Sequence, residues 1–140
     1  MERCTGCGLC VSHCTGKVLT PATRQLGMRN ALHPVMDFGE GYCLYNCNRC
    51  TQLCPTGALL PLTREEKHSY ICGTARVETG NCIGCGLCVR RCPRAAVKLT
   101  ETAGRRVAAV DSSQCIGCGA CEYICPASPF KAIVVDGNMN

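Results

Sequence analysis

Cysteine spacing constrains this chain more than any other feature. Sixteen of its 17 cysteines fall into four short groups, three spaced C-x2-C-x2-C-x3-C and one with an extra residue in its first gap. Three thiolates at such intervals suit one iron–sulfur cubane, and the fourth reaches a neighbouring cluster. The spacing therefore predicts four [4Fe–4S] clusters. The groups are Cys4-Cys7-Cys10-Cys14, Cys43-Cys47-Cys50-Cys54, Cys82-Cys85-Cys88-Cys92 and Cys115-Cys118-Cys121-Cys125.

Other cysteine-rich classes fit the pattern less well. Secreted domains use cysteines as disulfide frameworks, but triplets of closely spaced thiols pair poorly with one another. Zinc ribbons use separated C-x2-C pairs. Cys43, Cys47 and Cys50 also have the C-x3-C-x2-C spacing of radical S-adenosylmethionine enzymes. Cys54-Pro55 continues this group in the same manner as the others, and a 140-residue chain is too short for a partial barrel as well.

The composition predicts a fold that depends on its metal clusters. Apolar residues make up 46% of the chain with the 17 cysteines included, and roughly a third without them, below the usual share. There is no Trp, and there are only two Phe and four Tyr, so an ordinary core is thin. We expect bound clusters to stabilise the fold and the metal-free protein to lose it.

The formal net charge of +5 does not indicate nucleic-acid binding. Each cubane with its four thiolates carries roughly −2, so four clusters bring the loaded protein near −3. We expect redox proteins as partners and no nucleic acid. Arg90, Arg91 and Arg94 surround Cys92, where they form either a solvated face or a docking patch for an acidic redox partner.

The sequence predicts a protein without a membrane span. No apolar run approaches the roughly 18 residues that a span requires, and no basic and apolar leader opens the chain. We expect a cytoplasmic location. The alternatives are the periplasm, or attachment to a membrane through a partner or a missing N-terminal segment.

An internal repeat divides the chain into two halves. The first and third motifs agree at eight of eleven positions, and the third and fourth at seven of eleven. We expect units at residues 1–62 and 74–140, joined by a linker at 63–73. Thr63 and Glu66 have the spacing of a capping box, which predicts a short helix from Arg64 to Tyr70.

The second half has the more regular pattern. Short β-rich stretches flank its motifs, and `ETAG` between two of them indicates a hairpin turn at Gly104. Each motif is expected to end in a short helix that carries its fourth cysteine and stops before the following proline. This predicts an α+β unit of order βαββαβ. Its strands are expected at Ala75–Glu78, Val97–Thr100, Arg106–Val110 and Lys131–Val135.

The first half departs from this order. Only three residues precede Cys4, so we expect the opening strand to be missing or very short. Thr15 rather than proline follows Cys14, and the spacer at residues 15–42 holds 28 residues against 22 between Cys92 and Cys115. The sequence leaves open whether `RQLGMRNALHP` in this spacer forms a helical turn or a loop.

Residues 75–137 resemble a bacterial-type ferredoxin with two [4Fe–4S] clusters, on the strength of the motifs `CIGCGLCVRRCP` and `CIGCGACEYICP`. The resemblance implies crossed ligand sets, in which the fourth cysteine of one motif serves the other motif's cluster. The same rule extends to the first half. The implied sets are Cys82, Cys85, Cys88 and Cys125; Cys115, Cys118, Cys121 and Cys92; Cys4, Cys7, Cys10 and Cys54; and Cys43, Cys47, Cys50 and Cys14.

Over its whole length the chain resembles the polyferredoxins, including iron–sulfur accessory proteins of the nitrate-reductase-maturation type, which share endings like `CPTGALLPLT` at Cys54–Thr63. The resemblance implies an electron carrier with two ferredoxin-like units and no reaction of its own. An obligate electron-transfer subunit of a larger oxidoreductase is the first alternative. A redox sensor that responds to cluster loss is the second.

A few residues lie outside this scheme. Cys72 belongs to no motif and is expected to be a small buried side chain between the linker and the second half, rather than a ligand or a redox-active thiol. His13, His33 and His68 are expected on the surface or in packing roles. Motif glycines permit a positive φ, and we expect them to aim backbone N–H groups at sulfurs. These are Gly6, Gly8, Gly84, Gly86, Gly117 and Gly119.

Overall fold

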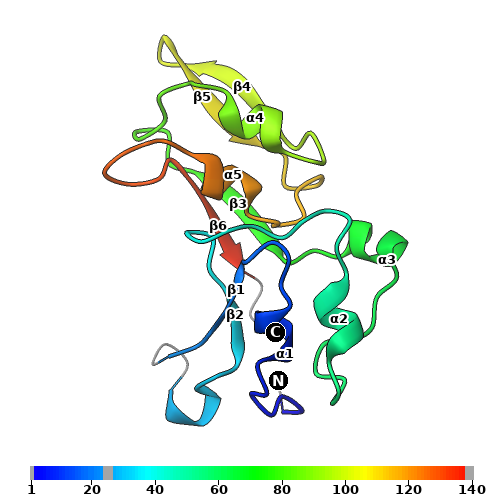
Figure 1. Ribbon diagram of the computed structural model, residues 1–140. Helices are drawn as coiled ribbons and strands as arrows, with labels where there is room; N and C mark the ends of the chain where they lie inside the picture. Colours follow the sequence, from blue (N-terminus) through cyan, green and yellow to red (C-terminus); the bar gives the residue numbers. More distant parts are fainter. Residues whose placement is uncertain (1, 24–26, 138–140) are drawn as a thin grey trace. The chain divides into compact units, whose positions relative to one another are not determined.

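The computed structural model describes residues 2–23 and 27–137 (Figure 1). The chain forms two compact units, which divide between Tyr70 and Ile71. We call them the first and the second unit and describe each by itself.

The second unit has the element order strand, helix, strand, strand, helix, strand. Its outer strands β3 and β6 pair antiparallel, and its inner strands β4 and β5 form an antiparallel hairpin (Figure 1). The elements are β3 (Gly73–Val77), α4 (Leu87–Arg91), β4 (Val97–Thr102), β5 (Arg105–Val110), α5 (Ala120–Ile124) and β6 (Ile133–Gly137).

The strands predicted for this unit are confirmed, with ends that shift by one or two residues. In the β4–β5 hairpin, Thr102 pairs with Arg105, so the connection is a two-residue turn. Ala103 and Gly104 both have positive φ, 51° and 73°, as a tight turn that matches the strand twist requires. The turn expected at `ETAG` is therefore present.

The first unit shares only the inner part of this order. It has helix α1 (Leu9–Ser12), strand β1 (Leu19–Pro21), the 3₁₀ turn η1 (Met28–Asn30), strand β2 (Pro34–Met36) and helix α2 (Arg49–Leu53). The helical turn left open in the spacer is present as η1; Arg24, Gln25 and Leu26 of that segment lie outside the described residues.

The first unit departs from the βαββαβ order, as its short leading segment predicts: its described residues contain no counterpart of the outer pair β3–β6. The segment after α2 contains Pro55 and Pro61, which lack the N–H group that a ladder needs. The antiparallel β1–β2 pair was not predicted, because each strand has three residues and Pro21 faces Pro34 at one end.

The four motif helices correct a further expectation. Each carries the third cysteine of its motif, and the fourth lies beyond its end. Cys54, Cys92 and Cys125 are the C-cap residues of their helices and have extended conformations with ψ of 110° to 120°. The proline after each of them excludes helical geometry at the preceding residue. The fourth cysteine is thereby turned away from its own helix.

Each unit buries mainly small residues, and the second unit also buries four cysteines. The largest fully buried side chains are Ile133 and Val18, and the other buried residues include many alanines. The predicted linker helix is confirmed as α3 (Arg64–Ser69), with both capping-box hydrogen bonds between Thr63 and Glu66. No helix among the described residues is long and apolar enough to cross a membrane.

Candidate iron–sulfur sites

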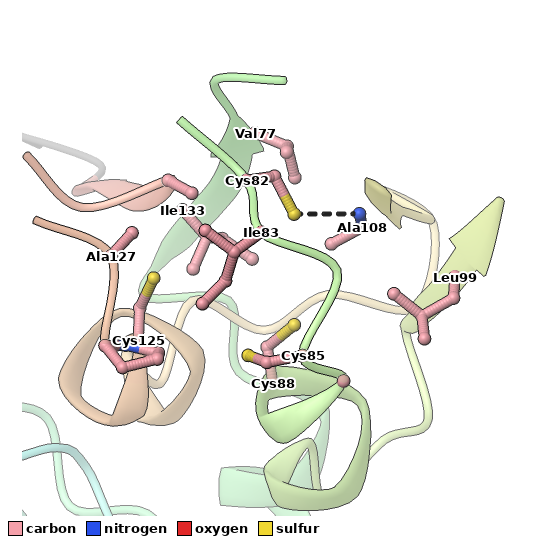
Figure 2. A pocket seen from close by; sticks show the side chains of 13 residues that line it. Val77, Cys82, Ile83, Cys85, Cys88, Leu99, Ala108, Cys125, Ala127 and Ile133 are labelled. Carbon is pink, nitrogen blue, oxygen red and sulfur yellow. Dashed lines mark hydrogen bonds between the residues drawn. The ribbon is translucent and has the colours of Figure 1, made fainter. Parts of the chain in front are cut away.

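The first cysteine pocket lies in the second unit, and we call it site 1. It is lined by Cys82, Cys85 and Cys88 of the third motif and by Cys125 of the fourth. Figure 2 shows these four side chains around one space, with Ile83, Leu99 and Ile133 beside them. Site 1 therefore contains three cysteines from one motif and one cysteine that lies 37 or more residues further along the sequence.

A second pocket in the same unit, site 2, repeats the arrangement with the motifs exchanged. It is lined by Cys115, Cys118 and Cys121 of the fourth motif and by Cys92 of the third. The two sites are thus related by an internal two-fold repeat, and each contains the cysteine that is turned away from the opposite motif's helix.

Hydrogen bonds to sulfur follow the same exchange. The Ala108 N–H of β5 donates to Cys82 Sγ over 3.4 Å (Figure 2), and the Ala75 N–H of β3 donates to Cys115 Sγ over 3.4 Å. Ala75 and Ala108 each lie seven residues before the first cysteine of a motif, yet each donates to the other motif. Such N–H···S bonds stabilise a thiolate and tune the metal group it holds.

Close packing explains why two glycines are required here. A Cβ atom on Gly117 would lie 2.3 Å from the Gly73 nitrogen, and one on Gly84 would lie 2.6 Å from the Arg106 oxygen. Both residues also have a positive φ, 71° and 70°. Each motif loop therefore packs directly on a strand that leads to the opposite motif.

A third pocket, site 3, lies in the first unit. It is lined by Cys4, Cys7 and Cys10 of the first motif and by Cys54 of the second. The Leu59 N–H donates to Cys54 Sγ over 3.5 Å, and the Thr56 hydroxyl lies 3.6 Å from the same sulfur. These contacts lower the pKa of the Cys54 thiol to about 7, so it ionises readily.

The remaining cysteines of the first unit, Cys14, Cys43, Cys47 and Cys50, form a group that we call site 4. Burial, together with repulsion from Cys43, Cys47, Cys14 and, least, Cys10, raises the pKa of the Cys50 thiol to about 11. A tight contact brings the segments together, because a Cβ on Gly16 would lie 2.1 Å from the Tyr42 oxygen. The Tyr42 N–H also donates to the Gly16 oxygen over 3.2 Å.

The thiols gather in a way that favours a compensating cation when they ionise. Burial, together with repulsion from the nearby Cys118, Cys115 and Cys92, raises the pKa of the Cys121 thiol to about 12. The pKa of Cys88 and that of Cys10 are also raised by burial and by the cysteines of their own motifs. Four thiolates in a buried site repel one another unless iron neutralises them, so this donor set fits an iron–sulfur cluster.

The arrangement differs from a site for a single ion. Within residues 2–23 and 27–137, no three His, Cys, Asp or Glu side chains converge in a manner that suits one metal ion. A cubane binds each thiolate through a different iron atom, so its ligands surround a volume rather than a point. The cysteine-lined pockets have this form.

Cys72 and the three histidines lie outside the three described cysteine pockets. Cys72 is half-buried beside β3, where its N–H donates to the Ile116 oxygen over 2.8 Å, and it lines none of the three pockets. His13 is exposed, His33 is buried, and His68 stacks on Tyr45 with ring centroids 4.1 Å apart. None of these histidines lines a described cysteine pocket.

The positive φ expected of the motif glycines is confirmed for all six. N–H donors to sulfur include Leu59, Ala75, Ala96 and Ala108, which lie outside the motif loops. Backbone N–H groups inside the motifs, at Val11, Val89 and Glu122, also act on the sulfurs of Cys10, Cys88 and Cys121, where they oppose the rise in pKa. Alternation in the strands could have indicated Ala75 and Ala108, since each faces inward beside a motif. No sequence signal indicates which sulfur an alanine N–H will reach.

Comparison with known proteins agrees with this geometry. Two family models, each described as a 4Fe-4S dicluster domain, match residues 3–58 and 75–135. The two matches and their cysteines fit four [4Fe–4S] clusters. The match over residues 3–58 favours a ferredoxin motif over a radical S-adenosylmethionine loop at Cys43, Cys47 and Cys50.

Two relatives show similarity to longer stretches of the chain. The uncharacterized ferredoxin-like protein YdhX of Escherichia coli is 33% identical over 103 residues, which are 66% of this chain and 41% of YdhX. The ferredoxin oxidoreductase 1 subunit ForD of Aquifex aeolicus is 37% identical over 68 residues, which are 46% of this chain and 78% of ForD. The chain thus spans about two fifths of YdhX.

The identity of the fold follows from these matches together with the cysteine pockets. Two tandem 4Fe-4S domains account for both units, and most of ForD is covered at 37% identity. The chain belongs to the family of 4Fe-4S dicluster ferredoxins, which are iron–sulfur electron-transfer proteins.

Proposed function

We propose that this protein carries single electrons on four [4Fe–4S] clusters, two in each unit, held by crossed ligand sets. Sites 1, 2, 3 and 4, as defined above, are the proposed ligand sets, and each takes three cysteines from one motif and one from its neighbour. The proposal includes no substrate reaction of its own. It also includes the expected division into residues 1–62, a linker at 63–73 and residues 74–140.

The observation that carries the proposal is the crossed composition of the three cysteine pockets. In each of them, three cysteines from one motif face the fourth cysteine of another motif. Cys50 feels more repulsion from Cys43, Cys47 and Cys14 than from Cys10 of site 3, which supports the same grouping at site 4. Four protein ligands for each cluster leave no open iron position for a substrate.

In this proposal the clusters supply the one-electron chemistry, and the protein holds, shields and tunes them. Buried apolar side chains such as Ile133, Ala108 and Ala132 line site 1 and restrict water. Backbone N–H groups at Ala75, Ala96, Ala108 and Leu59 offset negative charge on the sulfurs. Both effects favour transfer of an electron without loss of the cluster.

A second candidate is an obligate subunit of a larger oxidoreductase. The similarity to ForD, which is named as a subunit of a ferredoxin oxidoreductase, favours it. In both candidates the partners are redox proteins, and we place the protein in the cytoplasm, where reducing conditions preserve free thiols for assembly. Co-purification from the native cell separates a free carrier from a subunit.

Iron and sulfide analysis of the anaerobically purified protein tests the cluster count. We expect about sixteen irons and sixteen sulfides per chain, and EPR signals of [4Fe–4S]⁺ centres after reduction with dithionite. A reproducible value near twelve irons, with three centres, would contradict the four-cluster proposal. A sensor would instead show one labile cluster, and its output would not depend on electron flux.

A further inference from the structure

One charged side chain lies at the wall of a cysteine pocket. Among the described residues that line sites 1, 2 and 3, Arg94 at site 2 is the only lysine, arginine, aspartate or glutamate. It was expected to share a surface patch with Arg90 and Arg91. Those two side chains are exposed, whereas Arg94 is half-buried.

One nitrogen of the Arg94 guanidinium has a hydrogen-bond partner, and another, which is buried, has none in the part of the chain that the structure describes. Its Nη2 donates to the side-chain oxygen of Gln114 over 3.4 Å, and Gln114 directly precedes Cys115 of site 2. Its Nε is buried and has no hydrogen-bond partner within the described residues. A buried, unpaired donor on a cationic group is costly, so its presence beside a site for an anionic group points to a partner there.

The internal repeat allows the residues at equivalent positions of sites 1 and 2 to be compared. Arg94 follows Cys92-Pro93 at site 2, and Ala127 occupies the equivalent position after Cys125-Pro126 at site 1. The two sites share the cysteine pattern and the Ala N–H donors to Cys82 and Cys115. Site 2 has one further donor, the Ala96 N–H to Cys92 Sγ, whose equivalent at site 1 is Pro129. At the position of Arg94 and Ala127, the repeat therefore differs by one positive charge and one side-chain N–H donor.

Two other cations lie near site 1 and are bound differently. Lys131 Nζ donates to the Cys125 backbone oxygen over 2.9 Å, and Arg105 Nη2 donates to the Cys82 backbone oxygen over 3.0 Å. Neither residue lines the pocket, and both have backbone partners. The charge of Arg94 therefore bears on the potential of its own site and does not rank the two sites.

We propose that Arg94 is a tuning residue of site 2: its Nε–H and its charge face the anionic group held there and make that group easier to reduce. The inference rests on the proposed function. Reduction adds one electron and hence one negative charge to the bound group, and a nearby fixed cation stabilises the added charge. Arginine remains protonated throughout, so no proton or bond of Arg94 changes.

The test is an EPR-monitored redox titration of the full, cluster-loaded chain, with dithionite as the one-electron donor. For Arg94→Ala we expect one reduction step to move to lower potential while the others stay in place. The expected change is an about tenfold smaller equilibrium constant for reduction, ~59 mV for a one-electron couple. Arg90→Ala removes the same charge from an exposed position and is expected to change no step more than threefold.

The reciprocal variant uses the repeat. Ala127→Arg introduces the charge at site 1, so we expect a different step to move, this time to higher potential. The proposal is overturned if the two variants move the same step. It is equally overturned if Arg94→Ala, with full iron content, leaves every step within threefold of the unmodified protein.

Iron content separates tuning from folding. If Arg94→Ala loses iron, Arg94→Gln replaces it, because glutamine keeps an N–H donor without the charge. A lowered step with full iron in Arg94→Gln supports the proposal, and loss of iron or an unmoved step contradicts it. The unmodified protein is titrated first, so a chain without reducible [4Fe–4S] centres contradicts the proposed function before any variant is compared.

Discussion

The two units of this molecule use the same cysteine pattern with different degrees of enclosure. In the second unit, Cys82, Cys88, Cys118 and Cys121 are buried; in the first unit, none of the eight motif cysteines is. The cavity at site 3 measures about 90 Å³, against about 20 Å³ at each of sites 1 and 2. The described part of the first unit also lacks counterparts of β3 and β6.

This difference shows what the outer strands contribute. β3 supplies the Ala75 donor to Cys115, packs against Gly117 and pairs with β6. In the first unit, packing between Gly16 and Tyr42 and hydrogen bonds of Leu59 and Thr56 with Cys54 hold the cysteine segments without outer strands. The motif spacing alone brings the cysteines together, and the outer strands bury them.

The largest expected effect comes from removing the metal. We expect a strong iron chelator under mildly oxidising conditions to unfold the protein, with the first unit losing structure before the second, because its thiols are less enclosed. Far-UV circular dichroism and limited proteolysis, followed together with iron release, measure this order. Simultaneous loss of structure in both units would show that their different enclosure does not affect stability.

Cys125→Ala tests the crossed sets. We expect loss of the cluster at site 1, or roughly a quarter of the iron, although Cys125 lies in the motif that dominates site 2. The reason is that Cys125 lines the pocket of Cys82, Cys85 and Cys88. Iron analysis and EPR measure the result, and Cys54→Ala gives the matched loss in the first unit. Damage to site 2 with site 1 intact would show that the sets are not crossed.

A pair of glycine substitutions measures how tightly the loops are packed. Gly117→Ala places a Cβ 2.3 Å from the Gly73 backbone at a φ of 71°, whereas Gly8→Ala meets no atom within 4 Å at a φ of 74°. Both variants have similar backbone strain, of about 1–3 kcal/mol, and only the first adds a clash. We expect Gly117→Ala to lose iron from the second unit and Gly8→Ala to be milder. Equal iron loss would mean that strain dominates.

Cys72→Ser is expected to have the smallest effect. Sixteen other cysteines fill four sites, and Cys72 lines none of the three pockets. We expect full iron, unchanged EPR signals and a destabilisation below about 1 kcal/mol, from replacing a half-buried thiol by a hydroxyl. The loss of one cluster in this variant would identify Cys72 as a ligand.

Local patterns in the sequence predicted much of the second unit. Its strands, the turn at Ala103 and Gly104, and the capping box at Thr63 and Glu66 follow from neighbouring residues, because β-rich runs, tight turns and helix caps are set over a few positions. The β1–β2 pair escaped prediction because its strands are short and contain Pro21 and Pro34, so tertiary context overrides propensity there.

The sequence by itself determined the family, the four motifs and the sixteen cysteines, since iron–sulfur binding depends on thiol spacing along the chain. Only the tertiary structure decided how these parts are enclosed. It places the Ala75 and Ala108 N–H groups on sulfurs of the opposite motif, and it separates Arg94 from Arg90 and Arg91 by burying its Nε at site 2. Such contacts join residues that are far apart in sequence, or distinguish neighbours with identical side chains, so no local pattern specifies them.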